Sequence, residues 1–246
     1  MIIDSHLHLR DDRFVAAEGT PENIIALMDQ AGIDRSVVFK IWCSTESSIR
    51  AGQEAAEKFA DRLIPYVYAV PGYERPVARD LEEALSEKGF RGVKLHAGDC
   101  SLAEYVVDPV LALAGRHDVP CLIDFCGRHA AAERILRQFP KTKIIIAHLG
   151  AYLSTDEQLI DGFIDLGAGH DNAYLDVSGV VLPLKIKDAV TKAGSRKVLW
   201  GTDGPRRAPD TLAFMRTELD KVRSLGLSDS QQQDVLGGTI ARLLQM

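Results

Sequence analysis

The sequence lacks the features that mark several large classes of protein. Only four of its 246 residues are cysteine, and none of these has CxxC spacing, which excludes a disulfide framework. No apolar run approaches the ~20 residues needed to cross a bilayer, and no signal peptide is recognisable. Acidic residues outnumber basic ones by 35 to 29, so the positive excess typical of nucleic-acid-binding proteins is missing. We therefore expect a cytoplasmic globular protein with neither a nucleic-acid nor a membrane partner.

The chain does contain a regular alternation of two kinds of segment. Short apolar runs rich in β-branched residues recur about every 30 residues, and the gaps between them have helical periodicity. The apolar runs are nearly continuous, which is typical of parallel strands that are covered on both faces. The expected strands are 1–4, 36–41, 63–70, 92–95, 120–124, 143–147, 173–177 and 197–200.

Local signals mark the limits of individual helices. Thr20 and Pro21 provide an N-cap and a first-turn proline, and Gly32 ends the helix that follows. The segment from Ser228 to Gln231 is a capping-box pattern ahead of a last helix. No linker, charge block or low-complexity tract divides the chain.

Eight strand–helix units of this length fit one α/β domain, a single (β/α)8 barrel over residues 1–246 with an additional C-terminal helix. A doubly wound open sheet is the competing interpretation, because periodicity alone does not establish that the sheet closes. No GxGxxG follows the first strand, which removes one common reason to prefer the open sheet.

Histidines gather where the expected strands end, and in a barrel this is where function resides. His6 and His8 follow the first expected strand, His96 the fourth and His148 the sixth. Residues two apart on an extended segment point the same way, so the imidazoles of His6 and His8 can converge on one metal ion unless they simply face solvent. Asp4 shares their face and could orient one of them.

The other polar groups at strand ends each allow two interpretations. Asp203 lies in the segment Gly201-Thr202-Asp203-Gly204-Pro205 after a very apolar strand, where a carboxylate is costly unless it is paired or metal-bound; alternatively it caps the next helix. Glycines 201 and 204 would let the backbone approach a site closely. His148 could be a core residue with a satisfied hydrogen bond or, beside a metal, an electrostatic stabiliser or acid–base group.

Several of these segments together resemble a known family. They are 4–8, 92–96, 147–150, 176–179 and 201–205, and the closing segment 236–244 adds to the likeness. In this order they resemble the amidohydrolase superfamily, in particular the amidohydrolase-related branch that includes lactone hydrolases and mononuclear-zinc decarboxylases. The resemblance spans nearly the whole chain and implies a metal-dependent barrel enzyme.

The resemblance also implies roles for individual residues. His6 and His8 would be ligands of one divalent ion, zinc with manganese as the alternative, and Asp203 would be both a ligand and a proton acceptor. His148 would lie beside the water or the substrate. The family usually has a further histidine ligand where this chain has Asp124. A carboxylate can bind zinc and shifts the preference toward manganese, so Asp124 is the expected ligand, ahead of His129 or of a weak or empty site.

The implied activity is the opening of a lactone, amide or ester bond of a small anionic substrate by a metal-activated water. Asp203 would take the proton of that water, and His148 would stabilise the developing oxyanion or donate a proton. A decarboxylase or hydratase of an unsaturated carboxylic acid is the first alternative. The second is a barrel that has lost its ion and retains a binding role.

Basic and imidazole side chains near the strand ends indicate the kind of substrate. The expected substrate-binding residues are Arg10, Lys94, His96, Arg128 and Arg206. In an acidic protein such a concentration favours a small molecule that carries a carboxylate or phosphate, although some of these residues could be solvated loop charges. Lys94 could instead be a carbamylated bridging ligand or form an ion pair inside the barrel. Association with further copies of the chain is left open.

Overall fold

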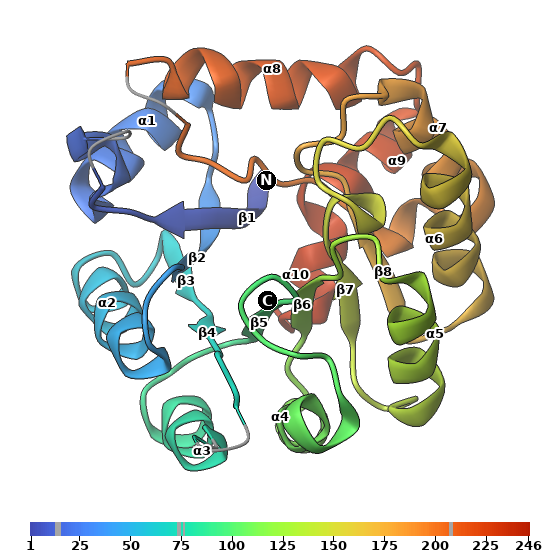
Figure 1. The fold of residues 1–246 in the computed structure, drawn as a ribbon. Coiled ribbons are helices and arrows are strands. Elements are labelled where there is room, and N and C mark those ends of the chain that lie inside the picture. Colours follow the sequence, from blue (N-terminus) through green and yellow to red (C-terminus); the bar gives the residue numbers. More distant parts are fainter. Residues whose placement is uncertain (13–15, 73–74, 76, 207–208) are drawn as a thin grey trace.

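Parallel strands form the wall of a barrel, and helices cover its outer face (Figure 1). The structure is a computed structural model that describes residues 1–12, 16–72, 75, 77–206 and 209–246. In these ranges the strands are β1 (Ile3–Leu9), β2 (Arg35–Lys40), β3 (Leu63–Pro65), β4 (Val67–Tyr68), β5 (Val93–His96), β6 (Cys121–Asp124), β7 (Ile144–Ile146), β8 (Ala173–Asp176) and β9 (Val198–Leu199).

The helices follow the strands in alternation. The α-helices are α1 (Pro21–Ala31), α2 (Thr45–Lys58), α3 (Ala78–Glu87), α4 (Glu104–Arg116), α5 (His129–Gln138), α6 (Glu157–Gly169), α7 (Pro183–Ala193), α8 (Thr211–Arg223), α9 (Asp229–Gln233) and α10 (Thr239–Leu243). Shorter helical segments are η1 (Ala16–Gly19), η2 (Ala147–Gly150), η3 (Ser195–Lys197) and η4 (Asp234–Gly238).

The strand pairs are all parallel and fall into the orders β1-β2-β3 and β4 through β9. β3 and β4 are two parts of the expected strand 63–70, and between them the N–H of Tyr66 donates to Val38 O at 2.9 Å. At the other edge the N–H of Ser5 donates to Trp200 O at 3.1 Å, and the N–H of His8 donates to Gly204 O at 2.7 Å. Backbone hydrogen bonds thus join the two groups of strands at both edges, and the prediction of a (β/α)8 barrel is confirmed.

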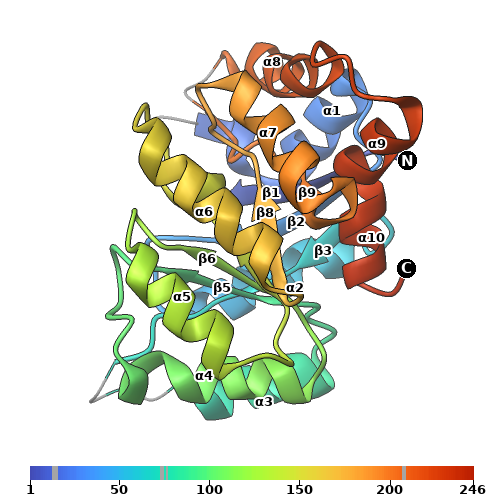
Figure 2. The same cartoon turned by 90° about the vertical axis from the view of Figure 1, so that its right-hand side faces the viewer.

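The barrel interior is filled by side chains and is closed at one end by the C-terminal helix. Inward-facing apolar residues of the strands, such as Phe39, Leu122 and Ile145, form one cluster with Ile240 and Leu243 of α10. Both termini lie at this end of the barrel (Figure 2). Because β1 starts there, it is the end where the parallel strands begin. Function is therefore expected at the opposite end, where the strands finish.

The expected helix limits are found at both marked places. The side chain of Thr20 accepts from the N–H of Asn23 at the start of α1, and Gly32 ends α1 with a φ of 75°. Ser228 and Gln231 form the capping box of α9. The last helix is not continuous, however, since η4 has a π-type turn between α9 and α10. A Cβ at Gly237 would lie 2.5 Å from Met1 O, so this glycine lets the turn pack against the start of β1.

The first strand is longer than predicted. His6 and His8 lie inside β1 rather than after it, because β1 continues to Leu9. The register against β2 shifts between Asp4 and Leu7, where β1 has one residue more than its partner strand. Such a bulge changes which side chains share a face. The two histidines are consequently held by a buried strand and not by a loop.

Candidate active site

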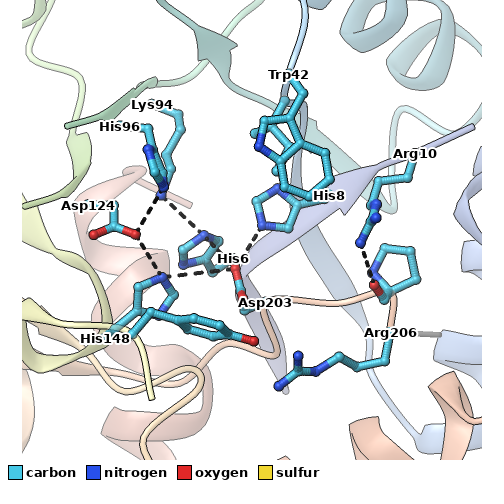
Figure 3. A pocket seen from close by; sticks show the side chains of 13 residues that line it. His6, His8, Arg10, Trp42, Lys94, His96, Asp124, His148, Asp203 and Arg206 are labelled. Atoms are coloured by element: carbon cyan, nitrogen blue, oxygen red, sulfur yellow. Dashed lines mark hydrogen bonds and ion pairs between the residues drawn. The ribbon is translucent and has the colours of Figure 1, made fainter. Parts of the chain in front are cut away.

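A pocket of about 290 Å³ opens at the end of the barrel where the strands finish (Figure 3). The sequence-predicted residues that line it are His6, His8, Arg10, Lys94, His96, Asp124, His148, Asp203 and Arg206. Trp42 and Tyr152 also line it. The structure therefore brings together side chains from segments that are far apart in the sequence.

Asp203 is the meeting point of the two histidines of β1. Its Oδ1 lies 2.7 Å from His8 Nε2 and 3.2 Å from His6 Nε2. Asp203 follows β9 and has a φ of 58°, in the left-handed region that non-glycine residues rarely adopt. A Cβ at Gly201 would lie 2.8 Å from the Cβ of His6, so glycine is needed there for this segment to pack so closely against β1. The two imidazoles and the carboxylate form one cluster of potential metal ligands.

The group that orients His6 is Asp176, at the end of β8. Its Oδ2 lies 3.1 Å from His6 Nδ1, and the hydroxyl of Ser178 is also 3.1 Å from that nitrogen. Both residues lie in the segment 176–179 that carries the family resemblance, but no pattern in the sequence indicates this role for them. With Nδ1 held in this way, Nε2 of His6 is left to face Asp203.

Asp4 does not have the orienting role suggested by the sequence. Its carboxylate accepts from the hydroxyl of Thr202 at 2.6 Å and from the N–H of Thr202 at 3.0 Å. It also accepts from the backbone N–H of His6 at 3.0 Å, and none of its described hydrogen bonds goes to an imidazole ring. Burial raises the pKa of Asp4 to about 7, although the hydrogen bonds from Thr202 oppose this shift. Asp4 therefore fixes the turn that carries Asp203.

His148 lies in η2, directly after β7, and has a φ of 58°. Its Nδ1 lies 2.8 Å from Ser178 O. Since a carbonyl oxygen only accepts, Nδ1 carries the proton of this hydrogen bond. Nε2 lies 4.0 Å from Asp203 Oδ1 and 3.5 Å from Asp124 Oδ2. His148 thus presents one ring nitrogen to the carboxylates of the pocket.

His96 and Asp124 form the opposite wall, at the ends of the adjacent strands β5 and β6. The two residues are paired in register, and His96 Nε2 lies 3.3 Å from Asp124 Oδ2. His129, the alternative ligand to Asp124, does not line the described pocket. It begins α5, and its Nε2 lies 3.2 Å from Gly162 O, because its ring packs against α6.

Lys94 is buried in the barrel wall, and its Nζ lies 3.2 Å from His6 Nε2. Burial lowers the pKa of this ammonium group, while the carboxylates of Asp124 and Asp203 oppose the shift. The sequence grouped Lys94 with substrate-binding residues, whereas the structure places it beside the potential metal ligand His6. The sequence-based alternatives for Lys94, an ion pair inside the barrel or a carbamylated bridging ligand, stay predictions.

The protonation states of the cluster suit a divalent metal ion. Burial lowers the pKa of both His6 and His8, which favours neutral imidazoles. For Asp203, burial would raise the pKa, but the imidazoles of His148 and His8 hold it below its usual range. Metal ions bind imidazole in its neutral form and carboxyl groups in their ionised form, so these groups already have the required charge.

The geometry is compatible with such an ion as well. Two ligands about 2.0–2.1 Å from a tetrahedral zinc are about 3.3 Å apart, close to the 3.2 Å between His6 Nε2 and Asp203 Oδ1. The 2.7 Å between His8 Nε2 and Asp203 Oδ1 is a hydrogen-bond distance, which a bound ion would have to widen. The carboxylate–imidazole pair of Asp176 and His6 is the arrangement by which proteins commonly orient a metal-binding histidine. The residues present therefore fit a divalent cation.

Two arginines lie on the side of the pocket away from Asp124 (Figure 3). Arg10 pairs with Asp12 at 2.6 Å and lies over the ring of Trp42. Arg206 lies 4.5 Å from the ring centroid of Phe214. Arg128, also predicted to bind substrate, does not line the described pocket, because its guanidinium donates to Ala97 O.

Two aromatic side chains, Trp42 and Tyr152, complete the pocket without having been assigned a specific role from the sequence. Trp42 is 64% exposed and belongs to the pocket wall. Tyr152 lies close to His148, with 5.0 Å between the ring centroids. Its position four residues after His148 is the one signal in the sequence, and such a spacing alone does not indicate a pocket residue.

Comparison with known proteins agrees with this architecture. The family model described as amidohydrolase matches residues 3–246. Among proteins with curated descriptions, none matches. None of the described helices has the length and hydropathy to span a membrane.

Solved structures that resemble the chain cover it almost completely. One is a probable 2-pyrone-4,6-dicarboxylic acid hydrolase from Acinetobacter baumannii with citric acid bound, with a TM-score of 0.75, 18% identity and coverage of 100% of this chain and 99% of that one. A second is a 4-oxalomesaconate hydratase from Rhodopseudomonas palustris, with a TM-score of 0.74 and 15% identity. The match covers 100% of this chain and 96% of that one. A third is a dihydroxybenzoic acid decarboxylase from a Polaromonas species with bound manganese and an inhibitor, with a TM-score of 0.70 and 18% identity. The match covers 99% of this chain and 96% of that one.

At these identities the structural likeness establishes the fold, whereas the family rests on the sequence match along almost the whole chain. The chain therefore belongs to the amidohydrolase family and is an enzyme of the amidohydrolase-related type.

Proposed function

We propose that this enzyme uses one divalent cation to hydrolyse a lactone, amide or ester bond of a small anionic substrate. The observation that carries the proposal is the position of Asp203, whose Oδ1 is within 3.2 Å of both imidazoles of β1 and 4.0 Å from His148. Zinc is the proposed ion and manganese the alternative. The manganese in the Polaromonas neighbour supports keeping that alternative.

The proposed ligands are His6, His8 and Asp203, with Asp124 as a further ligand from the opposite wall. When bound, a divalent cation polarises a substrate carbonyl and lowers the pKa of a water molecule. Asp203 is ionised at neutral pH, because its pKa is lowered by His148 and His8 against the effect of burial, and can accept the proton of the attacking water. The same carboxyl group can then return the proton to the leaving group.

His148 would act on the other side of the reacting bond. Its Nδ1 is fixed by Ser178 O, so Nε2 is the nitrogen that can hold or release a proton in the pocket. The carboxylates of Asp124 and Asp203 lie 3.5 and 4.0 Å from this nitrogen. A donor in this position can stabilise an oxyanion as the carbonyl is attacked.

The proposed substrate is a small organic acid. Arg10 and Arg206 bring two guanidinium groups to the pocket, and guanidinium groups pair well with carboxylates. Trp42 and Tyr152 provide aromatic walls on which a flat ring can pack. The names of the structural neighbours, which refer to a pyrone dicarboxylic acid and a dihydroxybenzoic acid, support this class of substrate.

The proposal is tested by purifying the protein without chelators, measuring bound metal, and assaying a panel of carboxylated lactones, amides and aromatic acids. We expect bound divalent metal and hydrolysis without release of CO2. Release of CO2 or addition of water to a double bond would establish the alternative reactions instead. Less than about 0.2 equivalents of metal, with no recovery on adding Zn²⁺ or Mn²⁺, would support the metal-free alternative.

The variant His6→Ala provides the matching test of the site. It should abolish turnover and the metal bound at this cluster and leave the circular dichroism spectrum unchanged, because His6 is a pocket residue and the barrel core is formed by others. Turnover retained by this variant would refute the proposed site.

A further inference from the structure

His96 faces the carboxylate of Asp124 across two neighbouring strand ends (Figure 3). His96 ends β5 and Asp124 ends β6, and the two residues are directly paired in the parallel register. Their side chains approach to 3.3 Å, between His96 Nε2 and Asp124 Oδ2. The fold therefore supplies this contact without any ligand, and its meaning depends on which nitrogen of the ring carries the proton.

The loop after β5 answers that question. The backbone N–H of Gly98 donates to Nδ1 of His96 at 3.0 Å. A backbone N–H can only donate, so Nδ1 offers its lone pair and the proton of the neutral ring is on Nε2. A Cβ at Gly98 would lie 2.8 Å from the His96 ring, so glycine lets the loop approach the ring this closely. Nε2 of His96 is consequently a donor that points at Asp124.

The position of this loop is itself fixed by Asp99. Its carboxylate accepts from the hydroxyl of Tyr68, a buried residue of β4, which ties the loop to the barrel wall. Asp99 Oδ2 also lies 3.3 Å from Nδ1 of His96. A proton on Nδ1 that is shared with Asp99 is the competing arrangement, but that proton would face the N–H of Gly98.

Asp124 is held at both of its oxygens. Oδ1 accepts from the N–H of Cys126 at 2.8 Å, and Oδ2 faces His96 and also lies 3.5 Å from Nε2 of His148. Burial would raise the pKa of Asp124, but the hydrogen bond from His96 opposes this and holds the pKa below its ordinary range. Each carboxylate oxygen can accept two hydrogen bonds or ligand contacts, so Oδ2 keeps one lone pair for the pocket.

We propose that His96 is a positioning residue, which donates from Nε2 to Oδ2 of Asp124 and so holds this carboxylate for the divalent cation. The inference rests on the proposed function, in which Asp124 is a ligand. Hydrogen bonds to metal-binding carboxylates fix their orientation, and loss of such a partner typically lowers metal affinity about 10–100-fold. The substrate-binding role that the sequence predicts for His96 would instead require Nε2 to face the substrate.

Nitrogen-15 NMR of the histidine side chains locates the proton directly, in protein treated with a chelator. The spectrum of His96→Gln, which lacks the signals of His96, assigns them in the wild type. We expect Nε2 of His96 to carry a proton, and a ring whose Nε2 carries none overturns the proposal. This measurement involves neither metal nor substrate, so its result does not depend on the proposed hydrolytic function.

The affinity for Zn²⁺, measured by competition with a chelating dye, tests the consequence for the site. His96→Phe keeps a ring and removes the donor, so the affinity should fall at least about tenfold. His96→Gln keeps an N–H donor at the end of its side chain and should recover most of that loss. Wild-type affinity in His96→Phe, or an equal loss in both variants, overturns the proposal.

Two further variants identify the cause of a negative result. His117→Phe is the matched control and should keep the affinity, because His117 pairs with Glu82 and does not line the described pocket. If Asp124→Asn loses metal while His96→Phe keeps it, the positioning role of His96 alone is wrong. If neither variant loses metal, Asp124 is not a ligand, and the ligand set of the proposed function is wrong as well.

Discussion

The carboxylate of Asp176 lies 3.1 Å from Nδ1 of His6, the ring nitrogen that does not face Asp203. Both side chains are completely buried, so water cannot substitute for either partner. An ionised carboxylate only accepts hydrogen bonds, which keeps the proton of a neutral His6 on Nδ1. Nε2 is then free of a proton and available to a metal ion. The end of β8 therefore determines the chemistry of a residue in β1.

Asp176→Asn tests this dependence with little change in shape. The asparagine NH2 group can donate to Nδ1 of His6 and would favour the tautomer with the proton on Nε2, which cannot bind a metal. We expect the affinity for Zn²⁺ to fall about 10–100-fold, as measured by competition with a chelating dye. Asp165→Asn, at an exposed position of α6, is the matched control and should change nothing. Equal affinities for the Asp176 variant and the wild type would show that Asp176 does not position His6.

Asp124→Asn distinguishes the two ligands that the sequence left open. The carboxylate lies in the pocket, whereas His129 is bonded to Gly162 O against α6. We expect Asp124→Asn to weaken metal binding at least about tenfold and His129→Ala to leave it unchanged. Isothermal titration with Zn²⁺ and Mn²⁺ measures both. If instead His129→Ala is the variant that loses metal, the ligand set proposed for this site is wrong.

Arg206→Ala tests the proposal that the substrate is an anion. A charged hydrogen bond contributes about 1.5–3 kcal/mol, so KM for a carboxylated substrate should rise by about 10- to 100-fold, and kcat should change less. Arg128→Ala is the control, because its guanidinium donates to Ala97 O and does not line the described pocket. An unchanged KM in Arg206→Ala would assign substrate binding to other residues.

The sequence was sufficient for the barrel because its signals are repeated and local. Each unit has an apolar run and a capped helix, and the caps at Thr20 and Ser228 lie where they were predicted. Interactions between distant segments were harder to predict. The bulge between Asp4 and Leu7 depends on the register of β1 against β2. The spacing of residues along the sequence therefore could not show which partners Asp4 would meet.

The sequence is likewise limited in predicting which side chains enter the candidate active site. Strand-end positions correctly indicated that His6, Asp124 and Asp203 face one pocket, since the ends of parallel strands meet on one side of a barrel. They did not distinguish Arg206, which lines the pocket, from Arg128, which turns to a backbone carbonyl. The direction of a long side chain in a loop depends on partners that are remote in the sequence.

Asp234 connects the C-terminal helix to the barrel, and its removal should destabilise the protein in a pH-dependent way. Its carboxylate accepts from the hydroxyl of Ser195 at 2.7 Å and pairs with Arg242 of α10 at 2.8 Å. Burial alone would raise the pKa of Asp234, but Ser195 and Arg242 lower it below its ordinary value of 3.8. A lowered pKa means that the ionised form stabilises the fold, and that this contribution is lost as the pH falls through the lowered pKa.

We therefore expect Asp234→Ala to reduce the free energy of unfolding by about 1 kcal/mol at pH 7, as measured by urea denaturation. The difference from the wild type should be constant above the ordinary carboxyl range and should shrink as the pH is lowered below it, because the wild-type carboxylate then becomes protonated. Asp220→Ala, at an exposed position of α8, is the control. It should change the free energy of unfolding by less than about 0.5 kcal/mol both at pH 7 and below the ordinary carboxyl range. A loss in Asp234→Ala that stays the same at low pH would show that the ion pair with Arg242 does not hold α10 in the base of the barrel, and that packing of Ile240 and Leu243 does so alone.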